Sequence, residues 1–63
     1  MGEYEKAEIL YLKIKNIREN TFGKENHAYA NSVNNLGILY KNIGRYELAE
    51  AHYLEANEIY KKL

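Results

Sequence analysis

Apolar residues recur at intervals of three or four positions in three separate stretches of the chain. These stretches cover about residues 3–21, 27–42 and 45–62. Such spacing places apolar side chains along one side of an α-helix. Proline is absent and strong helix formers dominate the composition, which favours helix throughout. The pattern therefore predicts an all-α chain, with three helices in a single unit spanning residues 1–63.

Each predicted helix carries a stripe of residues expected to pack against its neighbours. The first stripe consists of Tyr4, Ala7, Leu10 or Tyr11, Ile14 and Ile17. The second consists of Ala30, Val33, Leu36, Gly37 and Tyr40, with Ile43 at its end. The third consists of Tyr46, Ala49, Tyr53, Ala56, Ile59 and Tyr60. Glycine inside a helix costs about 1 kcal/mol relative to alanine, so Gly37 predicts the close approach of another backbone, with the small Ala49 opposite.

Residues at the predicted helix ends suit the positions of caps. Asn26 is expected to cap the start of the second helix. Gly23 and Gly44 are expected to end the first and second helices in a left-handed conformation. Phe22 is expected to fold back onto the apolar side of the first helix. The turn of residues 43–45 is so short that the second and third helices must run antiparallel.

The N-terminal stretch is repeated near the C-terminus. Residues 2–21 align with residues 44–63 at an offset of 42, with eight identities in 20 pairs. A fixed period of this size is typical of stacked helical repeats. A chain of 63 residues holds one and a half such periods, so we expect a fragment of a repeat array, natural or engineered.

The repeated positions resemble the tetratricopeptide repeat family. Its pattern of a Leu-Gly pair, spaced aromatic residues, a turn glycine and small alanines is matched by Leu36, Gly37, Tyr40, Gly44, Tyr46, Ala49, Tyr53 and Ala56. The long period, and the run from Gly23 to His27, resemble the subgroup typified by kinesin light chains. The sequence departs from that subgroup at Ala28, where proline is common, at Val33, where tryptophan sometimes occurs, and at Lys15 and Asn57, where leucine is common.

The resemblance implies an α-solenoid in which each repeat is a helix pair. The first helix of a pair lines a concave groove and the second forms the outer face. The chain would then comprise an outer, an inner and an outer helix, equal to one and a half repeats. The family binds peptides or partner proteins in the groove, which implies a non-enzymatic interaction scaffold.

Polar residues of the second helix lie on the side opposite its apolar stripe. Helical spacing places six residues together on this side, namely Asn31, Asn34, Asn35, Ile38, Lys41 and Asn42. An asparagine amide both donates and accepts hydrogen bonds, and therefore suits a peptide backbone of any sequence. Lys41 suits an acidic group. The resemblance places this side in the groove, so these six residues are the candidate binding site.

Two apolar sides have no partner in the predicted three-helix unit. One is formed by Tyr4, Tyr11 and Ile14, and the other by Tyr53, Ala56 and Tyr60. Repeats of this kind do not bury their apolar sides alone. The chain is therefore expected to form a homodimer or higher homo-oligomer, either by docking of intact units or by exchange of helices through the turn 43–45. A purely structural, self-assembling unit without a ligand is the alternative function.

Composition and motifs argue against other classes of function. Nine basic and nine acidic residues balance, which gives no attraction to nucleic acid or to an anionic membrane. No apolar run is long enough to cross a membrane. His27 and His52 match no metal-ligand spacing, and His52 is expected to be half-buried in packing. We expect no enzyme activity, no cofactor and no metal, and the absence of cysteine fits a cytoplasmic protein.

Overall fold

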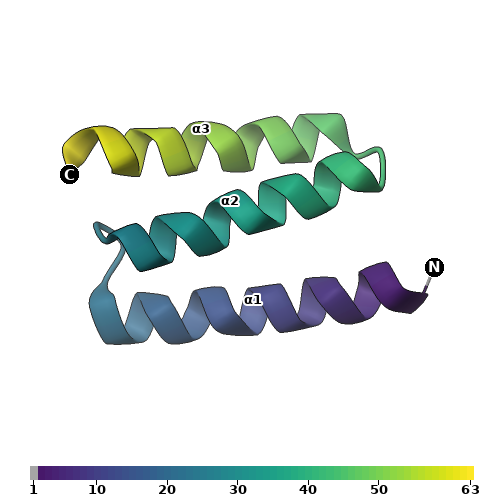
Figure 1. Cartoon of the computed structure of the whole chain (residues 1–63), viewed down its shortest axis with the longest axis horizontal. Coiled ribbons are helices and arrows are strands. Elements are labelled where there is room, and N and C mark those ends of the chain that lie inside the picture. The colour runs from purple at the N-terminus through teal and green to yellow at the C-terminus, as the bar shows by residue number, and fades with distance from the viewer. Residues whose placement is uncertain (1) are drawn as a thin grey trace.

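Three helices make up the part of the chain that the structure describes. This computed structural model describes residues 2–63, and the helices are α1 (Gly2–Phe22), α2 (His27–Asn42) and α3 (Tyr46–Lys62) (Figure 1). Residues 2–63 contain no strand, so the predicted all-α class is confirmed. Each helix begins and ends within one residue of the range that the apolar pattern indicated.

Capping residues lie at both ends of α2, at the positions that the sequence indicated. The Asn26 side chain accepts a hydrogen bond of 2.7 Å from the backbone N–H of Ala28 at the start of α2. At the other end of α2, Gly44 has a positive φ of 84°. There the Gly44 N–H donates to the Lys41 carbonyl over 3.1 Å, and the Arg45 N–H donates to the Tyr40 carbonyl over 2.8 Å. This pair of bonds satisfies carbonyls that the end of a helix leaves free.

The central helix, α2, lies between the other two and contacts both (Figure 1). The helices run antiparallel in sequence order. The Cα positions extend 35 × 21 × 10 Å, and the shortest extent is less than the roughly 13 Å that the Cα atoms of two stacked helices with axes 8–10 Å apart would need. The three helices therefore form one layer, so within residues 2–63 α1 and α3 each have only one helical neighbour.

The core lies mainly between α2 and α3. One buried cluster consists of Tyr29, Ala30, Val33, Ala56 and Ile59, with Tyr60 packed against it. The second consists of Leu36, Tyr40 and Ala49, with Tyr11, Ile43 and Tyr53 packed against it. The predicted stripe of α2 is therefore confirmed. Ser32 is also buried, and its hydroxyl donates to the Tyr29 carbonyl over 2.6 Å.

Gly37 lies where α2 and α3 pack tightly against each other. A Cβ atom at this position would lie 3.0 Å from two ring carbons of Tyr53 and 3.3 Å from the carbonyl oxygen of Ala49. The predicted tight crossing is confirmed. The tightest neighbour, however, is the aromatic ring of Tyr53 and not Ala49.

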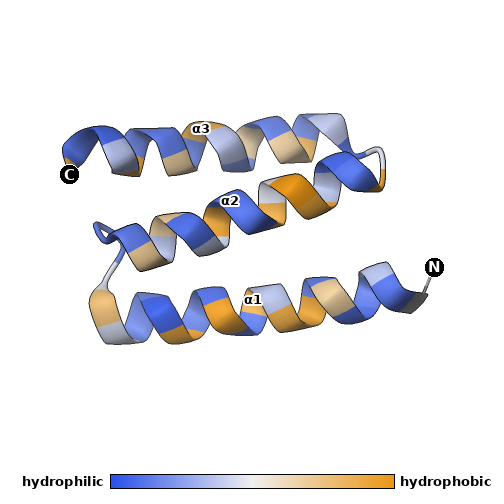
Figure 2. Cartoon of the chain, in the orientation of Figure 1, coloured by the Kyte–Doolittle hydropathy of each residue, from blue (hydrophilic) through white to orange (hydrophobic). Residues whose placement is uncertain are grey.

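The outer helix α1 packs on α2 through fewer apolar residues than the sequence indicated. Tyr11 is half-buried and Leu10 is 53% exposed, which decides between the two alternatives in favour of Tyr11. Tyr4 and Ile17 are also exposed. Figure 2 shows apolar residues along most of α1 beyond its N-terminal turn, on more than one side of the helix. A helix with one neighbour can cover only one of those sides.

Two expectations for aromatic residues were wrong. Phe22 is 55% exposed and does not fold back onto the core, because α1 continues through this residue. Tyr46 is 68% exposed. It is the first residue of α3, beyond the region where α2 and α3 pack most tightly.

Candidate functional site

The six polar and apolar residues predicted on one side of α2 form a continuous surface, which we call the asparagine strip. Five of them are exposed and Asn34 is half-buried. The strip consists of Asn31, Asn34, Asn35, Ile38, Lys41 and Asn42. Ile38 is 42% exposed, so the strip offers an apolar contact among its amides.

Packing on the other sides of α2 determines how the strip is presented. Ala30 and Leu36 are fully buried. Arg18 of α1 donates to the carbonyl of Ala28 over 2.8 Å and so joins α1 to the first turn of α2. These contacts hold α2 by its buried sides and leave the strip facing solvent.

A small cavity of about 50 Å³ lies beside the strip, between α1 and α2. It is lined by Tyr11, Ile14, Arg18, Ser32 and Asn35. A cavity of this size has room for a few water molecules or for the tip of a small aliphatic side chain. Asn35 belongs to both the cavity and the strip, so the cavity adjoins the exposed side of α2.

Two residues that the sequence did not assign to the strip, His27 and Tyr60, lie beside its start. The hydroxyl of Tyr60 donates a hydrogen bond to the side chain of Asn31. The ring of His27 lies 6.0 Å from that of Tyr60, centroid to centroid. The position of His27 four residues before Asn31 was a signal in the sequence. Tyr60 comes from α3, so only the fold places it here.

On the opposite side of α2, two buried tyrosines bridge to the outer helices. The hydroxyl of Tyr40 donates to Glu8 of α1 over 2.7 Å, and its ring lies 5.1 Å from that of half-buried His52. The hydroxyl of Tyr29 donates to Glu55 of α3 over 3.4 Å. Burial, with the hydrogen bond to Glu8, raises the pKa of Tyr40 to about 12. Burial, with the charges of Glu55 and Glu19, raises the pKa of Tyr29 to about 12.

Because the pKa values of Tyr29 and Tyr40 are raised, we expect the folded state to lose stability in alkaline solution. Their folded pKa of about 12 exceeds the ordinary value of 10.0, so the folded state favours the neutral form. Each unit by which the folded pKa exceeds the unfolded pKa corresponds to about 1.4 kcal/mol in the free energy of unfolding. This stabilisation is fully present below pH 10 and is lost as the pH rises through 12. Urea unfolding at a series of pH values measures this slope.

The matched variants carry phenylalanine, which does not titrate. Tyr29→Phe with Tyr40→Phe is expected to flatten the alkaline slope, whereas Tyr46→Phe, at an exposed position, is expected to leave it unchanged. Equal slopes in all three proteins would contradict the assignment.

Comparison with known protein families agrees with the repeat and with the paired antiparallel helices. Residues 1–62 match the family model described as tetratricopeptide repeat. The chain belongs to the tetratricopeptide repeat family. Searches of curated proteins and of solved structures each found no match. The resemblance to the kinesin light chain subgroup stays a prediction.

Tetratricopeptide repeats are generally protein–protein interaction modules, and the helices of this chain have the matching order. By the repeat pattern α2 is an inner helix, and α1 and α3 are outer helices. The asparagine strip lies on the inner helix. No helix within residues 2–63 is long and apolar enough to cross a membrane, and no three histidine or acidic side chains in this range come together as metal ligands.

The residues predicted for self-association differ in how far the tetratricopeptide fold buries them. Tyr4 is exposed, and Tyr11 and Ile14 are half-buried against α2. Tyr53 is half-buried over Gly37, Tyr60 is half-buried beside Asn31, and Ala56 is fully buried. Ala56 therefore belongs to no open surface, because α2 covers this side of α3.

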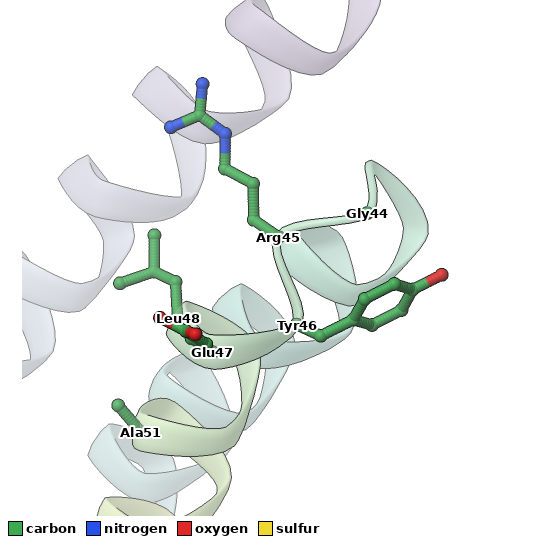
Figure 3. A pocket seen from close by; sticks show the side chains of 6 residues that line it. All are labelled: Gly44, Arg45, Tyr46, Glu47, Leu48 and Ala51. Atoms are coloured by element: carbon green, nitrogen blue, oxygen red, sulfur yellow. The ribbon is translucent and has the colours of Figure 1, made fainter.

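An open depression lies at the turn between α2 and α3 of the tetratricopeptide unit (Figure 3). Its lining residues are Gly44, Arg45, Tyr46, Glu47, Leu48 and Ala51. Figure 3 shows Arg45 and Leu48 projecting on one side, while Tyr46 points away from them. It lies at the outer helix, apart from the strip, and its wide opening holds no converging set of polar groups.

Proposed function

We propose that this tetratricopeptide repeat chain binds an extended segment of a partner protein along the asparagine strip. The observation that supports this most directly is the combination of exposure and free hydrogen-bonding capacity. Within residues 2–63, Asn31 is the only residue of the strip whose side chain forms a hydrogen bond, which it accepts from Tyr60. The amides of Asn34 and Asn35 are therefore ready to pair with the backbone of a ligand.

The strip also indicates the chemistry of the partner segment. Lys41 is its one ionisable residue and favours an acidic group near the C-terminal end of α2. Ile38 and the cavity beside Asn35 favour small aliphatic side chains. In a longer array, neighbouring inner helices would extend this surface into a groove. The role is that of a non-enzymatic scaffold, and the absence of cysteine favours the cytoplasm as its location.

Removing three side chains of the strip is expected to weaken peptide binding strongly without unfolding the chain. Peptides are selected from a random-sequence phage-display library against the intact protein, and their affinities are then measured for variants. Asn34→Ala, Asn35→Ala and Lys41→Ala together should weaken binding about tenfold or more, because each hydrogen bond lost contributes about 0.5–1.5 kcal/mol. Circular dichroism should show unchanged helicity.

The matched control removes the same residue types from the outer helices. Asn16, Asn57 and Lys13 are exposed on α1 and α3, and their replacement by alanine should leave peptide affinity unchanged. Peptides that bind the strip variant as tightly as the original protein would rule out the strip as the binding surface.

A second candidate function, self-association, is favoured by the surface of α1. No described side chain of α1 is fully buried, while Ile9, Leu10 and Ile17 are each more than half exposed. We propose dimerisation through such open apolar sides as the alternative. Sedimentation equilibrium tests this alternative, since a chain that stays monomeric over a wide concentration range does not self-associate.

A further inference from the structure

Three tyrosines recur at every seventh position along α3. They are Tyr46, Tyr53 and Tyr60, and because seven residues make close to two helical turns, the three side chains follow one side of the helix. Tyr46 is 68% exposed, whereas Tyr53 and Tyr60 are half-buried. Each side chain therefore keeps some of its surface in contact with solvent. We call this set the tyrosine row.

The tyrosine row runs beside the asparagine strip. The hydroxyl of Tyr60 donates to Asn31 at the start of α2, and the ring of Tyr53 lies against Gly37 further along that helix. Because α2 and α3 run antiparallel (Figure 1), Tyr46 lies near the C-terminal end of α2. The row and the strip are therefore adjacent parts of one surface, with aromatic rings from α3 next to amides from α2.

Hydrogen-bond donors of the strip adjoin these rings. Asn34 lies three residues before Gly37 and Lys41 lies four residues after it, which makes both of them neighbours of Gly37 on the helix surface. Asn31 accepts from the hydroxyl of Tyr60 with its side-chain oxygen, so both N–H donors of its amide remain for a ligand. The surface therefore combines aromatic rings with N–H donors.

The spacing of the row limits the conformation of a bound segment. Neighbouring tyrosines are about 10.5 Å apart along α3, and one turn of a polyproline II helix, which contains three residues, advances about 9.3 Å. Side chains on one face of a β-strand repeat at about 6.8 Å, which does not match. An α-helical ligand can match the spacing, but its backbone carbonyls bond within the helix and leave the donors of the strip unpaired.

We propose that this surface binds a proline-rich segment in the polyproline II conformation, with every third residue packed on a member of the tyrosine row. This inference rests on the proposed function, because the row borders the same strip. Proline has no backbone N–H, and polyproline II has no internal hydrogen bonds, so the segment presents free carbonyls to the N–H donors of Asn31 and Asn34. Its conformation is preformed, which lowers the entropy cost of binding.

The third member of the row is not part of the internal repeat. At the offset of 42 residues, Tyr4 and Tyr11 of α1 correspond to the first two members, whereas Arg18 corresponds to Tyr60. The Arg18 side chain donates to the Ala28 carbonyl and so helps to hold α1 on α2. A complete row is therefore present on α3 and not on α1, and the bound segment lies towards the α3 side of the strip.

Decaproline is the probe, because its polyproline II helix is about 31 Å long and the row is about 21 Å long. Nuclear magnetic resonance follows the ring signals of the tyrosines during titration of the intact protein and gives the dissociation constant. Tyr46→Ala should weaken binding about fourfold or more, because apolar contact equal to about one methylene group is lost. Tyr46→Phe, which retains the ring, should bind as tightly as the original protein.

Two controls separate the row from nonspecific contact. Tyr4→Ala removes a tyrosine that is 45% exposed on α1, and it should leave the affinity for decaproline unchanged. A peptide of the same length with alternating L- and D-proline has the same composition but cannot form the left-handed polyproline II helix, so it should not bind. Equal affinity for the two peptides, equal affinity of Tyr46→Ala and the original protein, or no binding of decaproline would each overturn the proposal.

Peptides selected from the random-sequence library distinguish a failure of this proposal from a failure of the proposed function. We expect the selected peptides to carry prolines three positions apart. If they depend on Asn34, Asn35 and Lys41 while decaproline does not bind, the strip is a binding surface and only the proline-rich ligand is wrong. If neither the selected peptides nor decaproline depends on these three residues, both proposals are wrong.

Discussion

Leu36→Ala is expected to remove a large share of the free energy of unfolding of the chain. Leu36 is 0% exposed and belongs to the buried cluster with Tyr40 and Ala49. Replacing a buried leucine with alanine costs about 2–5 kcal/mol, because the apolar contacts are lost and a cavity remains. A domain of this size has a total stability of roughly 3–9 kcal/mol. Urea unfolding followed by circular dichroism measures the loss.

The matched control for this prediction lies two residues further along the same helix. Ile38 is 42% exposed on the asparagine strip, so Ile38→Ala should change the free energy of unfolding by about 0.5 kcal/mol or less. Similar losses at both positions would mean that the division of α2 into buried and exposed sides is incorrect.

Gly37→Leu is expected to destabilise the packing of α2 against α3. The first carbon of the new side chain would already lie 3.0 Å from the ring of Tyr53, and leucine adds three further carbons beyond it. Overpacking of this kind costs about 1–3 kcal/mol or more. The gain in helix propensity on replacing glycine is about 1 kcal/mol at most, so the net effect on unfolding free energy is negative.

A double variant tests whether Tyr53 is the cause. Tyr53→Ala removes the ring that meets position 37, so the double variant Gly37→Leu with Tyr53→Ala should be more stable than the sum of the two single effects indicates. The expected coupling is about 0.5–3 kcal/mol. Asn35→Leu, at an exposed position on the same helix, should cause little change. Strict additivity would show that the clash lies elsewhere.

Local signals account for the features that were predicted well. The end of α2 follows from Gly44, because a left-handed residue and its hydrogen bonds are properties of a few consecutive residues. The asparagine strip follows from helical spacing within a single element, and all six of its residues lie on one side of α2. The 42-residue repeat and its motif identified the family before any contact between helices was known.

Only the tertiary structure decided which side of each outer helix is covered. α1 has apolar residues on several sides, so its periodicity does not choose between Leu10 and Tyr11, and contact with α2 makes the choice. Ala56 was expected on an open side and is fully buried, since α2 covers α3 there. The contact of Tyr60 with Asn31 joins α3 to the strip in the same way. Helix formation, capping and spacing act within a few residues, whereas burial depends on which neighbouring helix is present to exclude water.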